Sequence, residues 1–175
     1  MTVFAWIKGL WRDDEGTALL EGAIVLPCMF ALVMGALEFS FFFYHQHLVA
    51  TGVRDAARFL ARTDPGNTTM QTNAQNLAST GSIAGGSTRR VTGFDPADVG
   101  ITFTYVSNAA VSGVRPHREP PDWCGDPTAT NPQDWIRIIV VTGTYRYASI
   151  GLLSSFHVTI PTSHVTHRER CIGMG

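Results

Sequence analysis

A carboxylate stands at the entrance to the longest apolar stretch of this chain. Glu21 lies five residues after Gly16 and directly before the segment 22–44, whose one acidic residue is Glu38. An ionised carboxylate inside a membrane is costly unless a cation compensates it. Near the N-terminus of a helix at a membrane surface, however, an acid is favourable, because the helix dipole attracts negative charge. The residues alone leave both explanations of Glu21 open.

The two outer cysteines are a second pair with possible chemistry. Cys124 and Cys171 both lie in the polar part of the chain, after the apolar segment. In an oxidising compartment they are able to form a disulfide. The alternative is two free thiols, one buried and one in the C-terminal tail. Cys28 lies inside the apolar segment, where a cysteine serves as a small apolar residue.

Motifs of catalysis and phosphate binding are missing or incomplete. Gly81 and Gly86 have part of the spacing of a P-loop, but Ser87 takes the place of the required lysine and no apolar strand precedes the loop. The sequence also lacks G-x-S-x-G, C-x-x-C and H-E-x-x-H. A net charge of −1 gives no reason to expect a nucleic-acid partner. We therefore expect no enzymatic activity, no catalytic residue, no cofactor and no small-molecule substrate.

The histidines are poorly placed to share a metal ion. His45 and His47 are two residues apart in an expected helix and point to different sides of it. His164 and His167 are three residues apart in an expected strand, where side chains alternate between the two faces. We therefore expect no metal site.

The apolar segment 22–44 is long enough to cross a bilayer as a helix, which takes about 20 residues. A secretory signal peptide is the alternative, but its apolar core usually has only about 7 to 15 residues. The segment also continues directly into a helical pattern, which favours a membrane helix that is retained. Basic residues flank it on both sides and leave its orientation undecided: Lys8, Arg12, Arg54, Arg58 and Arg62.

The helix is expected to continue beyond the membrane. From Phe39 to Leu60 the apolar residues recur with the spacing i, i+3, i+4, i+7, and polar residues fall on the other side. One helix is therefore expected from about Thr17 to about Arg62, roughly 70 Å in length. Proline disfavours helix in the residue before it, so the sequence DPG at 64–66 should end this helix. Such a helix suits a chain that leaves a membrane and packs its outer half on a small domain.

A short helix and a long loop are expected in the polar part of the chain. Residues 67–80 have the composition of a short polar helix, with Thr68 or Thr69 as its cap. Residues 107–134 are rich in proline and lack periodicity, which predicts a long irregular loop.

Three segments predict strands. The segment 99–107 alternates between apolar and polar residues, and 134–148 is the strongest strand candidate. A third strand is expected over 156–169, where Pro161 predicts an edge position or a bulge. The expected fold is therefore α+β, with a long N-terminal membrane-spanning helix, a short second helix and an antiparallel sheet of three to four strands.

These features together resemble the N-terminal region of TadE-like proteins, the minor pilin-like components of tight-adherence pili. The resemblance rests on residues 16–62, GTALLEGAIVLPCMFALVMGALEFSFFFYHQHLVATGVRDAARFLAR, and is looser over 135–170. The features that match are Gly16, Glu21, Pro27 in IVLP, the pair of Glu38 and Phe39, and the tail RDAARFLAR.

The resemblance implies cleavage between Gly16 and Thr17 by a prepilin peptidase. Glu21 then becomes the fifth residue, and the new α-amino group lies about one helical turn away from it. A Glu21 carboxylate that pairs with the N-terminal amine of a neighbouring subunit would give register to an assembly. Pro27 removes one helical hydrogen bond and is expected to kink the helix. Glu38 is expected near the opposite face of the membrane, as an interfacial acid.

The resemblance also implies a division of the chain and a function. Residues 1–16 are expected to be a leader that is removed, residues 17–62 the transmembrane and amphipathic helix, and residues 63–175 an extracytoplasmic, pilin-like head. The chain is expected to be a minor pilin or pseudopilin in the bacterial cytoplasmic membrane, with its head in the periplasm or outside. It would contribute to assembly of a tight-adherence type IV pilus or a related secretion apparatus.

The implied partners are the prepilin peptidase, other pilin-like subunits, platform proteins of pilus assembly and membrane lipid. Two alternatives remain open at this point. One is a membrane-anchored scaffold of the secretion platform that is never polymerised. The other is an anchored envelope enzyme or ligand-binding domain.

Overall fold

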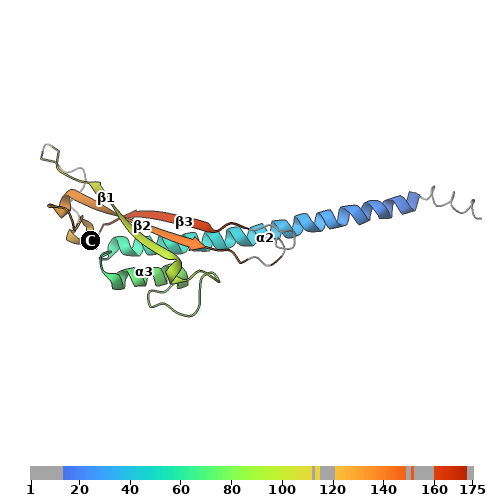
Figure 1. Cartoon of the computed structure of the whole chain (residues 1–175), viewed down its shortest axis with the longest axis horizontal. Helices are drawn as coiled ribbons and strands as arrows, with labels where there is room; N and C mark the ends of the chain where they lie inside the picture. The colour runs from blue at the N-terminus through green and yellow to red at the C-terminus, as the bar shows by residue number, and fades with distance from the viewer. Residues whose placement is uncertain (1–13, 112, 115–120, 149–150, 152–159, 173–175) are drawn as a thin grey trace, which may run out of the picture.

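The computed structural model describes residues 14–111, 113–114, 121–148, 151 and 160–172. Its elements are helix α2 (Asp14–Arg62), helix α3 (Thr68–Thr80), strand β1 (Val99–Ser107), strand β2 (Trp135–Tyr145), strand β3 (Ser163–Arg170) and three short 3-10 helices, η1 (Pro96–Asp98), η2 (Asp122–Cys124) and η3 (Pro132–Asp134). The strands form one antiparallel sheet in the order β1-β2-β3 (Figure 1). The predicted α+β fold is thus confirmed, with three strands in the described part of the chain.

Helix α2 is a single helix of 49 residues, which corresponds to a length of roughly 73 Å. The predicted long helix is confirmed, and it ends at Arg62 as expected. It begins at Asp14, so no break in the backbone marks the predicted boundary between leader and mature chain after Gly16. Residues 1–13 of the predicted leader lie outside the described part of the chain.

The second half of α2 packs on the sheet and provides much of the hydrophobic core. Val53, Ala56 and Leu60 are completely buried. The helix lies so close to β2 that a Cβ atom on Gly143 would come within 2.7 Å of a methyl group of Val53. Figure 1 shows α2 running along the sheet and then continuing far beyond it. The head is therefore fastened to one half of this helix only.

The two outer strands, β1 and β3, present one face to the core and the other to solvent, whereas the central strand β2 is buried or half-buried on both faces after Trp135. In β1, Val99 is buried and Ile101, Phe103 and Tyr105 are half-buried, while the residues between them are exposed or partly exposed as the alternation predicted. The predicted third strand begins only at Ser163, so the proline of that segment precedes β3; residues 156–159 lie outside the described part. The outward face of the sheet is rich in threonine: Thr102, Thr104, Thr142, Thr144 and Thr166.

Helix α3 has a different cap from the one predicted. The choice of Thr68 or Thr69 was wrong, because Asn67 is the N-cap and its side-chain oxygen accepts a hydrogen bond of 2.9 Å from the N–H of Thr69. Asparagine is a stronger N-cap than threonine, which explains why the helix begins one residue after it. The C-cap is Gly81, whose φ of 81° lies in the left-handed region that glycine adopts without strain.

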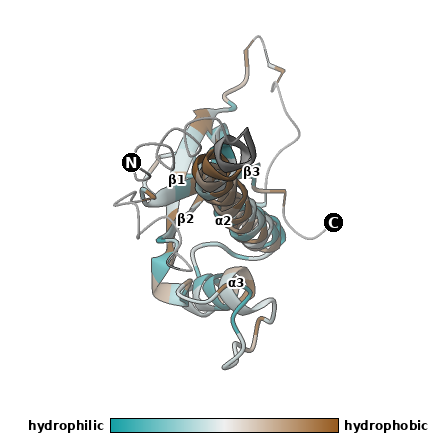
Figure 2. Ribbon diagram, turned by 90° about the vertical axis from the view of Figure 1, so that its right-hand side faces the viewer, coloured by the Kyte–Doolittle hydropathy of each residue, from teal (hydrophilic) through white to brown (hydrophobic). Residues whose placement is uncertain are grey.

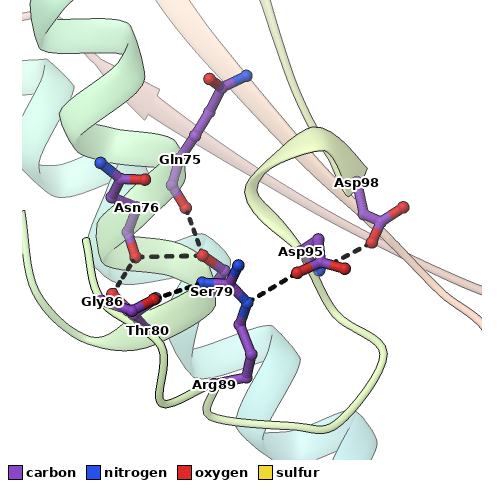
Figure 3. Close-up of polar contacts among 8 residues, drawn as sticks. All are labelled: Gln75, Asn76, Ser79, Thr80, Gly86, Arg89, Asp95 and Asp98. Carbon is purple, nitrogen blue, oxygen red and sulfur yellow. Dashed lines mark hydrogen bonds and ion pairs between the residues drawn. The ribbon is translucent and has the colours of Figure 1, made fainter.

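A hydrogen-bonded loop connects α3 to β1 (Figure 3). Arg89 donates from Nε to the carboxylate of Asp95 at 2.7 Å. The backbone N–H of Asp95 in turn donates to the carboxylate of Asp98 at 2.8 Å. Arg90 pairs with Asp55 at 2.8 Å and so ties the loop to α2. The start of β1 is therefore fixed by polar contacts as well as by the core.

A disulfide joins Cys124 to Cys171 across 47 residues, with the two Cα atoms 5.5 Å apart. It is the first of the two alternatives that the sequence left open. Next to it, the N–H of Ile172 donates to the carbonyl of Ala61 at 2.9 Å, which joins the end of the sheet to the end of α2. Closing a loop of this size restricts the unfolded chain and stabilises the fold by about 4 kcal/mol.

Gly52 lies where α2 and α3 touch. A Cβ atom there would overlap the carbonyl group of Ala78 in α3, which is backbone and cannot turn away. We expect Gly52→Ala to force the helices apart and to lower the free energy of unfolding by about 1 to 3 kcal/mol.

Gly35→Ala is the matched control, because a Cβ atom at that position of α2 meets nothing within 4 Å. It should be neutral or slightly stabilising, since alanine has the higher helix propensity. Urea unfolding of both variants in detergent measures the difference. Equal stabilities would contradict the close contact between the two helices.

Candidate functional site: the uncovered half of helix α2

The first half of α2 is largely uncovered by the rest of the described chain. Most large apolar side chains from Leu19 to Tyr44 are exposed, with fractions as high as 78% for Leu19 and 74% for Leu32. An 18-residue window of this helix has a mean hydropathy of 2.0 and none of it is buried. Figure 2 shows this part of α2 in brown, the colour of hydrophobic residues. Residues 19–44, called the uncovered segment below, are long and apolar enough to be a membrane anchor.

Glu21 lies at the N-terminal end of the uncovered segment, and its side chain is exposed. It forms no ion pair with any residue that the structure describes. Gly16 and Thr17 lie about one turn earlier in the same helix. The described chain therefore supplies no cation for this carboxylate, and the roles of these three residues stay predictions.

Pro27 lies inside α2, within the uncovered segment. Because proline has no N–H, the carbonyl of Ala23 lacks its helical donor. The helix nevertheless continues through this position as one element (Figure 1). The predicted kink stays a prediction.

Glu38 is completely buried, although it lies in a segment whose apolar residues are mostly exposed. Glu38, Phe42 and His45 are spaced i, i+4 and i+7 and lie on one side of α2. The ring of Phe42 meets Tyr147 edge-on with centroids 5.6 Å apart. His45 Nδ1 lies 3.1 Å from the hydroxyl oxygen of Tyr145. These five residues are called the junction cluster below, because they join the uncovered segment to the head.

The tyrosines of the junction cluster are held in their neutral form. Burial raises the pKa of Tyr147 above its usual value of 10.0, and the negative charge of Glu38 raises it further. Burial likewise raises the pKa of Tyr145, with an added contribution from Tyr147. Stability that depends on neutral phenols is fully present below about pH 10 and is lost as the pH rises through the raised pKa values.

The burial of Glu38 could not be found from its spacing in the sequence. The residues that approach it come from the end of β2 and beyond, about a hundred positions later in the chain. Its expected place at the membrane interface stays a prediction. What the structure adds is that the head covers this acid, so it is part of the contact between head and helix.

The arginines at the end of α2, spaced four residues apart, form an exposed stripe. Arg54, Arg58 and Arg62 are all exposed. None of them forms an ion pair within the described ranges of the chain. A surface hollow of about 440 Å³ lies beside Arg58 and Arg62. Such a face suits solvent, lipid headgroups or an acidic partner equally well.

Arg137 in β2 is a buried cation that the sequence analysis missed. Only 5% of it is exposed, and its Nη2 donates to the carbonyl of Gly125 at 3.2 Å. Its guanidinium lies over the rings of Phe103 and Tyr105, 5.2 and 5.8 Å from their centroids. The single charge within the apolar run WIRIIVV was the signal that could have indicated it.

The histidines are dispersed over the molecule. His45 belongs to the junction cluster and His47 is exposed. His164 lies 3.3 Å from the hydroxyl of Thr144, and His167 contacts the carboxylate of Glu169 at 3.1 Å. Among the described residues no three potential metal ligands lie together.

One polar hollow of about 430 Å³ lies beside η2 and η3. It is lined by Asp122, Asn131, Pro132, Gln133 and Asp134. The amide of Gln133 donates to the carboxylate of Asp122 at 3.1 Å, so part of its polar lining is already paired. This hollow is a surface feature of the head and lies apart from the uncovered segment.

Glu38→Gln tests the electrostatic contact within the junction cluster, because it removes the charge and preserves the size. We expect the pKa of Tyr147 to fall toward the value that burial alone sets, since no negative charge then disfavours the phenolate. The pKa of Tyr145 serves as the control and should be nearly the same in the variant as in the wild type. Ultraviolet titration of phenolate absorbance, with Tyr147→Phe and Tyr145→Phe to assign the transitions, measures both. A Tyr147 pKa that does not move would show that the two groups are not neighbours.

Comparison with known proteins gives a match for most of helix α2 and none for the rest of the head. No curated protein and no solved structure matches this chain. Residues 16–58 match the family described as TadE-like protein. The match runs from Gly16 through the uncovered segment and the junction residues of α2 to Arg58, and it ends before α3 and the sheet. The predicted resemblance to TadE-like proteins is thereby confirmed for residues 16–58.

Proposed function

We propose that this chain is a minor pilin or pseudopilin that contributes to the assembly of a tight-adherence type IV pilus or a related secretion apparatus. The observation that carries the proposal is the uncovered segment, which continues without interruption into the helix on which the head is built. The match of residues 16–58 to the TadE-like family supports a protein associated with such a pilus.

The dimensions of α2 support a membrane anchor. The uncovered segment has 26 positions from Leu19 to Tyr44, which correspond to roughly 39 Å of helix. A hydrocarbon layer is about 30 Å thick and the interfaces add to it. Soluble monomers rarely expose so large a continuous apolar surface. The head meets the last turns of this segment at the junction cluster, near the point where the helix would leave the membrane.

Processing by a prepilin peptidase would supply the missing partner of Glu21. Cleavage between Gly16 and Thr17 creates an α-amino group about one helical turn from the carboxylate. The described chain offers Glu21 no cation, and a neighbouring subunit would present its own N-terminal amine at the same depth. Such a pair would set the register between subunits, because breaking it leaves a charge in an apolar layer.

The disulfide supports a head on the oxidising side of the membrane. Structural disulfides persist in the periplasm and outside the cell and are rare in the cytoplasm. Together with the anchor, this favours a single-pass protein of the bacterial cytoplasmic membrane with residues 63–175 in the periplasm or outside. We propose no enzymatic role and no cofactor, and the partners are pilin-like subunits, platform proteins of pilus assembly and lipid.

Mass spectrometry of the protein from its own cells tests the processing step. We expect the mature N-terminus at Thr17, and Gly16→Leu should accumulate as full-length precursor because the bulky side chain obstructs the peptidase. Gly22→Ala is the control, since a Cβ atom there meets nothing within 4 Å, and it should be processed normally. A mature wild-type protein that still begins at Met1 would overturn the assignment.

Fibres sheared from the cell surface test the assembly step. The wild-type chain should be recovered in the fibre fraction as well as in the membrane. Glu21→Ala should insert and be processed as before, yet fall by about tenfold or more in the fibres, because a charge-assisted contact is lost at each subunit. Glu21→Asp keeps the charge and should recover part of the loss.

The fractions separate the proposal from its alternatives. A wild-type chain that stays wholly in the membrane would identify an unpolymerised scaffold. Fibres that contain Glu21→Ala at the wild-type level would show that the carboxylate rests at the membrane surface without a role in assembly.

A further inference from the structure

The direction of the backbone groups along β1 follows from two hydrogen bonds. The N–H of Asn108 donates to the carbonyl of Asp134 at 2.6 Å, in register with the ladder between β1 and β2. The even-numbered residues of β1 therefore bond to β2, since the two sides alternate along an antiparallel strand. The odd-numbered residues point the other way. Val99 agrees with this, because its carbonyl accepts a bond of 2.9 Å from the side chain of Gln75 in α3.

The outer edge of β1 is open beyond that first contact. Among the described strands, β1 is the terminal one and pairs with β2 alone. Within the described part of the chain, the outward N–H and C=O groups of Ile101, Phe103 and Tyr105 have no hydrogen-bond partner. These groups form a template on which another extended chain is able to pair.

Nothing in β1 protects this edge against pairing. The strand has nine residues, VGITFTYVS, with no charge and no proline, whereas the mean strand has about 5 to 6. Proteins usually blunt an open edge with charged side chains, proline or bulges. The other edge of the same sheet illustrates this, because β3 carries Arg168, Glu169 and Arg170.

The side chains beside the edge define what would fit. On the core side, Ile101, Phe103 and Tyr105 are half-buried and form an apolar shelf along the strand. On the outward side, Thr102 and Thr104 are exposed. An added strand would therefore place apolar side chains over the shelf and small polar ones beside the threonines.

We propose that β1 binds an extended, uncharged segment of a partner subunit, which alternates between apolar and polar residues and adds a fourth strand to the sheet. The backbone groups of Ile101, Phe103 and Tyr105 would hold it, and the apolar shelf would select its register. This inference deepens the proposed function and rests on it in one respect, the anchoring of α2 in a membrane.

Anchoring argues against a second copy as the occupant. Antiparallel pairing of two β1 strands in one continuous sheet requires a twofold axis perpendicular to the sheet. Because α2 runs along the sheet (Figure 1), that axis would point the two uncovered segments in opposite directions. Two copies in one membrane therefore cannot pair in this way, whereas a segment of a different chain is free to do so.

The edge is prepared for binding before a partner arrives. Arg89 and Asp95 fix the loop before β1 (Figure 3). Arg90 ties that loop to Asp55 of α2. Gln75 holds the first carbonyl of the edge. A partner strand would therefore have to order only itself, which reduces the entropic cost of binding.

Site-specific crosslinking in intact cells tests the proposal with the full chain. A benzophenone amino acid at Thr104, which is exposed beside the edge, should capture one partner at a single uncharged segment, identified by mass spectrometry of the crosslinked peptide. Ile101→Pro removes one outward N–H, a change that edge strands tolerate, and should lower the crosslinked fraction by about tenfold or more. Ile101→Val keeps the N–H and should crosslink as before.

A second matched pair of variants controls for a loss of crosslinking that is caused by misfolding. Phe103→Pro and Phe103→Leu both lose the ring over Arg137, but only the first loses an edge donor. Formation of the disulfide between Cys124 and Cys171 on non-reducing gels reports that each variant folds. If both proline variants fold and crosslink at the wild-type level, strand addition is refuted. Crosslinks from one β1 to another β1 would identify a second copy and overturn the proposed occupant.

The outcomes separate this inference from the proposed function. A chain that is processed and enters fibres, with crosslinks unaffected by proline, refutes strand addition alone. A chain that never leaves the membrane fraction, with crosslinks abolished by proline, refutes the fibre role and supports strand addition. Crosslinks to a charged or helical segment would contradict the chemistry that we assign to the partner.

Discussion

The constraint on which this molecule depends is that one unbroken helix has to satisfy two different surroundings. The side of α2 that carries Val53 and Leu60 is sealed by the sheet, whereas the apolar side chains of the uncovered segment are mostly exposed. Because a helix advances by 1.5 Å and about 100° with each residue, the position and direction of the head are set by the same element as the position of Glu21. Whatever surrounds the uncovered segment therefore also sets the orientation of the head.

The junction cluster is where these two surroundings meet. A carboxylate at this place has to be shielded, and Glu38 is shielded by the chain itself, beside Tyr147. The aromatic contacts from Phe42 and His45 extend the packing of the head along α2 beyond the end of the aliphatic core. The head thus packs along the last turns of the uncovered segment, from Glu38 onward.

The sequence was informative where a pattern is local. The long helix was predictable from an apolar run that continues into an amphipathic pattern. Strand β1 was predictable because apolar and polar residues alternate along it. The cap of α3 was missed by one residue because Asn67 and the threonines after it are competing caps. The burial of Glu38 could not be predicted, since Tyr147 approaches it from a position after β2, far along the chain. The lone charge of Arg137 in an apolar run was a signal for its burial, but its contact with Phe103 depends on strand pairing that is not visible in one sequence. The open edge of β1 likewise appears only once the order of the strands is known.

The disulfide has a mechanical consequence. Cys124 and Cys171 close a covalent ring that contains the whole of β2 and β3 but leaves β1, α3 and α2 outside it. Under tension between the two ends of the molecule, the chain inside the ring cannot lengthen beyond the bridge. Strand β1 lies outside the ring, and apart from the chain that leads to Cys124 it is held to β2 by hydrogen bonds and side-chain packing. A load applied along that strand would run parallel to its ladder with β2 and stress many of the hydrogen bonds at once, so this strand pair would be loaded in shear and not by peeling.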